Sequence, residues 1–252
     1  MVRLVAELWI VLNNKRSMIP KVIHYCWFGR GKKPELALKC IESWKRVLPE
    51  YQIKEWNEDN FDLDMYPYVC EAYKSGKFAY VTDVVRLYAL YTEGGVYMDT
   101  DVEVLKPLDP FLHHTAFSGF EDEENVPTGI MAAEKGSRWA KENLDYYRDR
   151  HFIKPDGSFD TTTNVTTITN YMIPHGLKRD NTYQDFPGLI TFYPNDYFCP
   201  KDHVTEQIHL TPNTVTIHHF AASWHSPMNR FKHRIIRWVK IHTGIRIGRK
   251  KY

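Results

Sequence analysis

The stretch that decides the fold is TDVVRLYALYTEGGVYMDTDV, residues 82 to 102. Its first half places apolar residues at helical spacing and stops at Gly94 and Gly95, which is typical of a helix that ends there. The run VYMDTDV that follows predicts a strand. This strand carries Asp99 and Asp101 toward its end, where they are either an ordinary acidic turn or a pair of metal ligands.

The aspartate pair is a weak signal when taken alone. Another D-x-D, Asp62-Leu63-Asp64, occurs with no strand before it and no glycine pair. In an extended segment, however, side chains repeat every two residues, so Asp99 and Asp101 would share a face. Two carboxylates on one face suit Mg²⁺ or Mn²⁺, which accept oxygen ligands.

A second constellation lies on the preceding helix. Asp83 and Arg86 are three residues apart, so they lie on one helix face. Taken alone, they would be a surface ion pair worth little. Because the helix leads directly into the strand, we expect this carboxylate and this guanidinium at the same rim as the two aspartates.

The alternation of elements continues outward from this stretch. Residues 19–29 predict a buried strand, residues 34–48 a helix and residues 51–56 a short strand. Such an order predicts an α/β fold, a parallel or mixed sheet with helices on its faces, whose ligands bind beyond the carboxyl ends of the strands. The second half is less regular, with a predicted helix at 138–150, predicted strands at 189–200 and 214–224, and a threonine-rich segment at 159–172 that is either a strand or a loop lining a site.

The composition is that of a soluble globular protein. The chain has 252 residues, 25% charged and 43% hydrophobic, which is enough for one large domain. Its four cysteines form no C-x-x-C pair, which favours reduced thiols over a zinc site or a disulfide framework. The first apolar stretch, residues 4–12, is too short to span a bilayer and lacks the features of a signal peptide. We therefore expect a cytoplasmic protein.

The charge is distributed unevenly along the chain. The residues from Met228 to the end hold nine Lys and Arg and no acid, which leaves 24 basic against 31 acidic residues in the rest. Apolar residues such as Ile235 and Trp238 alternate with these charges. Such a basic amphipathic tail can bind the inner face of an anionic membrane peripherally, and the alternative is a terminal helix packed on its own domain. The acidic body and the lack of a nucleic-acid module argue against a nucleic-acid partner.

The motifs together resemble those of glycosyltransferase family 32, the D-x-D sugar transferases that include Golgi mannosyltransferases and bacterial capsular and lipopolysaccharide transferases. The likeness covers residues 19 to 112 and returns at IHHFAASW, residues 217–224. It implies a single GT-A-type α/β domain, a nucleotide-sugar-binding mixed sheet flanked by helices, over residues 19–228. Residues 1–18 would then be an N-terminal extension, with Met18 a candidate start, and residues 229–252 a basic tail.

The resemblance also implies roles for the central residues. Asp101 would bind a divalent metal, Mn²⁺ or Mg²⁺, and Asp99 would reach the metal, the ribose or the donor sugar. Asp83 and Arg86 would hold hydroxyls of the donor sugar. Trp27 matches a position where an aromatic ring stacks on the nucleobase, which we favour over the alternative of a core tryptophan at a strand end. His24 is typical of the same first motif and receives no role.

The late motif TIHHFAASWHSP suggests a third metal ligand. Relatives among the toxin glucosyltransferases place a ligand five residues before a tryptophan, and counting back from Trp224 gives His219. Imidazole is an acceptable ligand for Mn²⁺. His218 would point to the opposite face of a strand and is the fallback, and a structural histidine is the alternative. Trp224 would lie near the diphosphate, and Ala222 replaces a serine of the toxin pattern.

The resemblance implies a metal-dependent, retaining hexosyltransferase. Its donor would be a nucleotide sugar, a UDP-sugar by preference, and its acceptor a surface glycan or a lipid-linked saccharide. The departing phosphate can take the acceptor's proton, so no separate catalytic base is assigned. One alternative is a GDP-mannose-dependent enzyme of the same fold. Another is a non-catalytic carbohydrate-binding protein, which leaves the four central residues unexplained. A phosphoesterase would need more clustered acid and histidine ligands.

Overall fold

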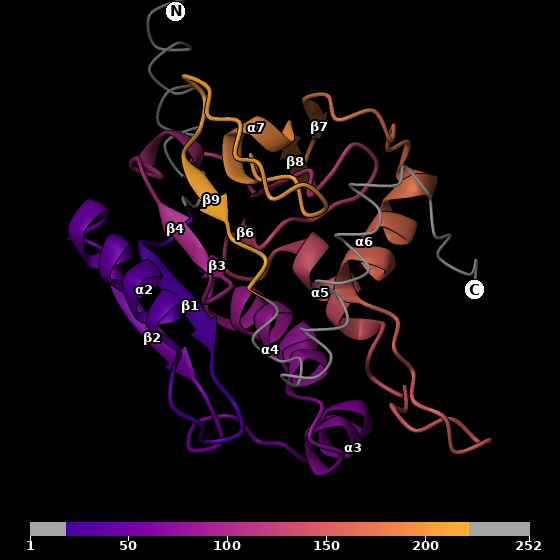
Figure 1. Ribbon diagram of the computed structural model, residues 1–252. Helices are drawn as coiled ribbons and strands as arrows, with labels where there is room; N and C mark the ends of the chain where they lie inside the picture. The colour runs from indigo at the N-terminus through magenta and orange to yellow at the C-terminus, as the bar shows by residue number, and fades with distance from the viewer. Residues whose placement is uncertain (1–18, 222–252) are drawn as a thin grey trace, which may run out of the picture.

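The computed structural model describes residues 19–221 (Figure 1). Its centre is a seven-stranded mixed sheet with the order β2-β1-β3-β6-β5-β8-β7, in which β6 and β7 run opposite to the other five. A separate two-stranded sheet pairs β4 with β9. The strands are β1 Val22–Cys26, β2 Gln52–Trp56, β3 Gly95–Met98, β4 Val102–Val104, β5 Ala116–Gly119, β6 Ile130–Ala133, β7 Gln184–Phe186, β8 Ile190–Tyr193 and β9 Thr216–His218.

Helices lie on both sides of this sheet, with α2 beside β1 and β2 and with α4, α5 and α6 on the other side (Figure 1). The predicted α/β fold, a mixed sheet flanked by helices, is confirmed. The helices are α2 Glu35–Val47, α3 Pro67–Lys74, α4 Phe78–Glu93, α5 Arg138–Asp145, α6 Asn164–Met172 and α7 Asn195–Phe198.

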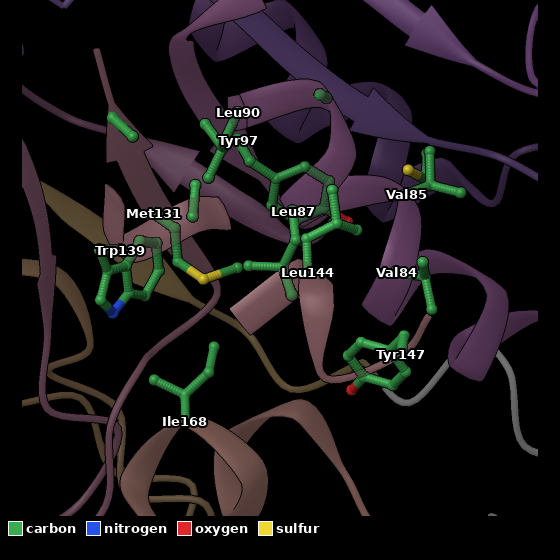
Figure 2. Packing of buried hydrophobic residues seen from close by; sticks show 14 of the residues in the cluster. Val84, Val85, Leu87, Leu90, Tyr97, Met131, Trp139, Leu144, Tyr147 and Ile168 are labelled. Carbon is green, nitrogen blue, oxygen red and sulfur yellow. The ribbon is translucent and has the colours of Figure 1, made fainter. Parts of the chain in front are cut away.

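Both faces of the sheet are buried, because alternate residues of its central strands enter two different hydrophobic clusters. Tyr97 of β3 and Met131 of β6 pack with Leu87 of α4 on one face (Figure 2). Val96 of β3 packs on the other face, in the cluster that holds Trp44 of α2. The period of two thus turns Tyr97, and the strand end just beyond it, toward α4.

Only glycine fits at the two positions that end α4, because other parts of the chain approach the backbone there too closely for a side chain. Gly94 and Gly95 have φ angles of +71° and +114°, which L side chains rarely adopt. A Cβ on Gly95 would lie 2.6 Å from the carbonyl oxygen of Val22 and 3.0 Å from His24 Nε2. The stop that the sequence predicted therefore lets β3 begin directly against β1.

His24, which had no assigned role, stabilises the connection between α4 and β3 through two hydrogen bonds. Its Nε2 lies 2.8 Å from the carbonyl oxygen of Gly94, and its Nδ1 accepts a hydrogen bond from the indole N–H of Trp56 at 3.1 Å. Since Nδ1 accepts, Nε2 carries the proton and donates to Gly94. Burial lowers the pKa of His24, in agreement with a neutral ring. This histidine is structural.

We expect Gly95→Ala to lower the free energy of unfolding by about 2 to 4 kcal/mol, because the new methyl group adds a clash to an unfavourable backbone angle. Gly136 is the matched control, since its φ is +78° but a Cβ there meets nothing within 4 Å. Gly136→Ala should cost only about 1 kcal/mol. Urea unfolding monitored by circular dichroism measures both, and equal losses would show that the close approach at Gly95 carries no energy.

Two side chains of α2 form hydrogen bonds with strand β4 of the two-stranded sheet. The indole N–H of Trp44 donates to the carbonyl oxygen of Val102 at 2.7 Å, and the backbone N–H of Val104 donates to the Ser43 hydroxyl at 2.9 Å. In the antiparallel register of β4 and β9, Val102 lies opposite His218. Figure 1 shows these two strands side by side although more than a hundred residues separate them. The turn between β3 and β4 is thereby held against β9.

The threonine-rich segment is neither of the predicted forms. Residues 164–172 form α6, with the Thr163 hydroxyl as its N-cap accepting from the backbone N–H of Thr166. Asn164, Ile168 and Met172 are buried at a spacing of four, which is a helical period. The β-branched residues suggested a strand, and the capping threonine together with this buried face decided for a helix.

Within residues 19–221, no helix is long and apolar enough to cross a bilayer. All four cysteines lie in this range and are free thiols, as predicted. The expectations about residues 1–18, the domain boundary at 228 and the basic tail of residues 229–252 concern parts of the chain outside the described residues.

Candidate active site

Arg86 lies between two carboxylates at the carboxyl-end edge of the sheet. Its guanidinium is 3.4 Å from Asp83 and 3.1 Å from Asp99. The side chains of Asp83 and Arg86 are each only 11% exposed, so this is not the surface pair of the alternative interpretation. Burial alone would lower the pKa of Arg86, but Asp99, Tyr97 and Asp83 raise it above its usual value. The expected meeting of the helix pair with the strand end is observed.

Tyr97 completes the surroundings of Asp99. Its hydroxyl donates to Asp99 Oδ1 at 3.0 Å, and its ring lies 4.7 Å from the Arg86 guanidinium carbon, a cation–π contact. The backbone N–H of Asp99 donates to the carbonyl oxygen of Gly129 at 2.8 Å. Sequence analysis did not single out Tyr97, although its position two residues before Asp99 on one strand was the available signal.

Asn164, the first residue of α6, holds Asp83 from the far side. Its backbone N–H donates to Asp83 Oδ2 at 3.1 Å, and its side-chain amide donates to the backbone carbonyl of Asp83 at 2.7 Å. Burial raises the pKa of Asp83 to about 6, with Arg86 opposing the shift. Asn164 was not predicted, because no sequence pattern links it to a helix 81 residues away. Its Oδ1 atom is buried without a hydrogen-bond partner in the described chain.

Asp101 is held by β9 and the residues after it. Its carboxylate lies 3.4 Å from His218 Nε2 and accepts a hydrogen bond from the backbone N–H of Ala221 at 2.7 Å. Burial alone would raise the pKa of Asp101, but His218 and the Ala221 N–H hold it at about 2. Asp101 is therefore a fixed anion.

The two aspartates meet by a turn and not along a strand. β3 ends at Met98, and the backbone N–H of Val102 bonds to the carbonyl oxygen of Asp99 at 3.0 Å, which closes a turn over residues 99–102. The prediction that Asp99 and Asp101 share one face of an extended strand is wrong. Asp99 instead leaves β3 on the side of α4, and Asp101 meets β9 after the turn. Ligand atoms of Asp99, Asp101 and His218 all lie within 4.8 Å of one another.

The preference for His219 as third ligand differs from the structure. His219 Nε2 lies 2.9 Å from Glu103 Oε2, while His218 faces Asp101. Consecutive strand residues point to opposite faces, and the register places His218 opposite Val102 and Ile217 opposite Glu103. His219, two residues from Ile217, therefore falls on the Glu103 side. Counting five residues back from Trp224 does not show how β9 pairs with β4, and a shift of one residue exchanges His218 and His219.

The grouped residues fit a divalent metal. Two carboxylates and one imidazole are a ligand set that Mn²⁺ accepts. Burial alone would lower the pKa of His218, but Asp101 raises it, so a bound metal would replace the proton on this imidazole. His218 Nδ1 is buried and makes no hydrogen bond of good geometry within the described residues, although the Cys199 thiol lies close enough to act on the ring.

We expect His218→Ala to weaken Mn²⁺ binding by about 10-fold to 100-fold, because one of three candidate ligands is lost. His219→Ala is the matched control, one residue away and bonded to Glu103 instead, and should change the affinity by less than about threefold. Isothermal titration of each purified variant with MnCl₂ measures this. A larger loss in His219→Ala than in His218→Ala would return the ligand role to His219.

Of the two tryptophans predicted to bind the donor, the structure describes Trp27 but not Trp224. Trp27 lies just beyond the carboxyl end of β1, at the same edge of the sheet as Asp99, and is partly exposed. Its indole N–H donates to the carbonyl oxygen of Gly31 at 2.6 Å, and the Lys33 ammonium lies 5.7 Å from its ring centre. Its stacking role stays a prediction. Trp224 and Ala222 lie outside the described residues.

Comparison with known proteins agrees with the class that this site defines. Residues 34–118 match the family model described as the glycosyltransferase sugar-binding region containing a DXD motif. The matched region includes α4, the glycine pair and both aspartates. The chain therefore contains a glycosyltransferase domain. The match covers the same motifs that resemble those of glycosyltransferase family 32.

Individual relatives support the same assignment. The chain is 30% identical over 133 residues to inositol phosphoceramide mannosyltransferase 3 of Schizosaccharomyces pombe, which covers 50% of the chain and 36% of the relative. It is 28% identical over 201 residues to a glycosyltransferase of Acanthamoeba polyphaga mimivirus, which covers 73% of the chain and 78% of the relative. The chain spans about a third of the length of the fission-yeast mannosyltransferases that it matches.

A solved glycosyltransferase, involved in glycosylation of the major capsid of PBCV-1, is similar over 85% of the chain and 98% of its own length. It shares 15% identity, with a TM-score of 0.45.

Proposed function

We propose that the protein is a metal-dependent, retaining glycosyltransferase that moves a hexose from a nucleotide sugar to a surface-glycan or lipid-linked acceptor. The observation that carries the proposal is the contact between Arg86 and Asp99. It joins a pair suited to sugar hydroxyls, Asp83 and Arg86, to a group suited to a metal and a diphosphate. A carbohydrate-binding module would need only the first half of this arrangement.

The proposed roles follow from the contacts. Arg86 presents charged N–H donors and Asp83 presents a carboxylate, and together they bind hydroxyls of the donor sugar. The Tyr97 hydroxyl and Arg86 orient Asp99, and the Ala221 N–H orients Asp101. Asp99, Asp101 and His218 hold the metal. When bound, the metal supplies positive charge to the leaving diphosphate, where negative charge develops.

In a retaining reaction of this kind, the acceptor attacks the face from which the diphosphate departs. The departing phosphate oxygen takes the acceptor's proton, so the chain needs no separate base. Residues around the sugar then have to bind it, orient it and exclude water.

The donor is the least determined element of the proposal. A UDP-sugar is the first candidate, from the family resemblance. GDP-mannose is the second, because relatives in two yeasts are named as mannosyltransferases or as a mannosyl phosphorylinositol ceramide synthase. Residues around Asp83 and Asn164 would face the sugar and select the hexose, and the residues around Trp27 would select the nucleobase.

Nucleotide-sugar hydrolysis tests the proposal. The purified protein is incubated with a panel of UDP-sugars and GDP-mannose, in MnCl₂ or in chelator, and release of UDP or GDP is measured. We expect turnover of one donor that chelator abolishes and MnCl₂ restores. If no donor is turned over and titration shows no metal-dependent binding of UDP or GDP, the transferase proposal is wrong and the binding-module interpretation replaces it.

The basic tail is proposed to hold the enzyme on an anionic membrane surface, where a lipid-linked acceptor would lie. We expect the full-length protein to sediment with vesicles that contain anionic lipid and to lose this binding in about 0.5 M salt, since screening weakens exposed charges. A variant that ends at residue 228 should stay in the supernatant under all conditions. Equal sedimentation of the two proteins would contradict the proposal.

A further inference from the structure

Glu121 lies at the same edge of the sheet as the candidate active site. It follows β5 by two residues, and Asp99 follows β3 directly. β3 and β5 are both antiparallel to β6, which separates them, so they run in the same direction. The carboxyl ends of strands that share a direction meet at one edge of a sheet, which is where α/β proteins bind ligands.

The loop after β5 folds back onto this site. The backbone N–H of Thr128 donates to the carbonyl oxygen of Gly119 at 3.1 Å, and that of Glu121 donates to the carbonyl oxygen of Asn125 at 2.8 Å. At the end of the loop, the carbonyl oxygen of Gly129 accepts from Asp99, and a Cβ on Gly129 would lie 3.1 Å from the His218 ring. Glu121 is thus held in a closed turn whose base touches the candidate metal ligands.

The acids that follow Glu121 in this loop have structural partners. Asp122 accepts from the backbone N–H groups of Glu124 and Asn125, Glu124 pairs with Arg179, and Glu123 accepts from the Asn181 amide. Within residues 19–221, the Glu121 carboxylate has neither a hydrogen bond nor an ion pair. It is only partly exposed. A partly buried, unpaired carboxylate is costly to keep, which points to a partner that binds from outside.

The charged groups that act on Glu121 show which parts of the candidate site lie near it. Burial raises its pKa to about 7, and His218, Asp122, Asp99 and Arg86 all lie near enough for their charges to act on it. The carboxylate therefore lies near both the sugar-binding pair and the metal group. It does not belong to the cluster of Asp99, Asp101 and His218, whose ligand atoms approach one another within 4.8 Å. In the proposed function, the sugar carbon that reacts lies between Asp83 and Arg86 on one side and Asp99, Asp101 and His218 on the other.

We propose that Glu121 is a further catalytic residue, whose carboxylate lies beside the reacting sugar carbon and stabilises the positive charge that develops there. This inference rests on the proposed function. In the step, the bond from the sugar carbon to the diphosphate oxygen breaks and the bond to the acceptor oxygen forms. The acceptor's proton passes to the leaving phosphate oxygen. Glu121 stabilises the positive charge on the sugar carbon and takes no part in this proton transfer.

The test compares Glu121→Gln with Glu123→Gln, an exposed acid of the same loop. Hydrolysis of the preferred donor in MnCl₂ uses water as the acceptor. We expect Glu121→Gln to lower kcat by about 100-fold, with binding of Mn²⁺ and of UDP or GDP changed less than about twofold. Glu123→Gln should match the wild type. A structural role would instead alter binding and kcat together, or the thermal midpoint.

A second variant distinguishes loss of the carboxylate from misfolding. In Glu121→Ala, added sodium formate supplies a carboxylate to the vacated space, and we expect it to raise kcat by about tenfold without affecting Glu121→Gln.

The outcomes separate this inference from the function on which it rests. An active wild type together with an equally active Glu121→Gln overturns the role of Glu121 alone. A loss of Mn²⁺ affinity in Glu121→Gln of about tenfold or more overturns it in favour of a metal ligand. A wild type that turns over no donor overturns the proposed function, and the role of Glu121 with it.

Discussion

Asp101→Asn is expected to lower metal-dependent donor turnover by about 1,000-fold, the upper range for loss of a group that stabilises developing charge. The substitution keeps the shape of the side chain and an oxygen that can accept from the Ala221 N–H. It removes the negative charge that is fixed 3.4 Å from His218. The candidate metal site thereby loses one of its two negative charges. Turnover of the preferred donor in MnCl₂, together with Mn²⁺ titration, measures the effect.

The chain contains its own control for this substitution. Asp64 belongs to the other D-x-D, outside the candidate site, and its carboxylate accepts only from the Cys70 thiol among its described contacts. Asp64→Asn should leave turnover and Mn²⁺ affinity unchanged, and both variants should unfold cooperatively. If Asp101→Asn retains more than about a tenth of the activity, Asp101 does not hold the metal.

Arg86→Met is expected to destabilise the protein by about 3 to 5 kcal/mol, the range observed when one partner is removed from a buried ion pair. Methionine keeps the apolar stem that packs over Tyr97 but leaves Asp83 and Asp99 as neighbouring carboxylates without their cation. Urea unfolding measures the loss. We also expect donor turnover to disappear, because the proposed sugar contact is lost with the guanidinium.

Two comparisons sharpen this result. Arg138→Met removes an arginine that is 68% exposed and paired with Glu142, and it should cost less than about 0.5 kcal/mol. Adding Asp99→Asn to Arg86→Met should restore about 1 to 2 kcal/mol, because Asp99 is then neutral, whereas burial already raises the pKa of Asp83. If the double variant is less stable than Arg86→Met alone, an unpaired carboxylate is not the cause of the loss.

Local patterns predicted the first half of the fold well, because the chain there meets local rules. α2 and α4 show apolar residues at helical spacing, and α4 ends at a glycine pair whose left-handed angles only glycine tolerates easily. β1, β2 and β3 are short runs rich in β-branched and aromatic residues. The predicted meeting of Asp83, Arg86 and Asp99 followed from these elements alone, since α4 leads directly into β3.

Predictions that depended on strand register or on contacts between residues far apart in the chain were wrong or were not made. The threonine-rich segment is helix α6, because Thr163 caps it and its buried face packs against the rest of the domain. His218 replaced His219 beside the aspartates, because the pairing of β9 with β4 decides which side of the strand faces Asp101. Asn164 and Glu121 carry no motif, and only the packed structure brings them to the site.

By itself, the sequence determined an α/β sheet, the helix that ends at Gly94 and Gly95, and the presence of a D-x-D at the edge of that sheet. These depend on residues close together in the chain, for which local steric and hydrophobic rules suffice. Tertiary structure alone decided which histidine faces Asp101, that a turn and not a strand joins Asp99 to Asp101, and that Glu121 lies near both. The choice of histidine depends on strand pairing across more than a hundred residues, where a shift of one residue turns every side chain to the opposite face. The turn and the position of Glu121 depend on how β3, β5 and β6 pack together.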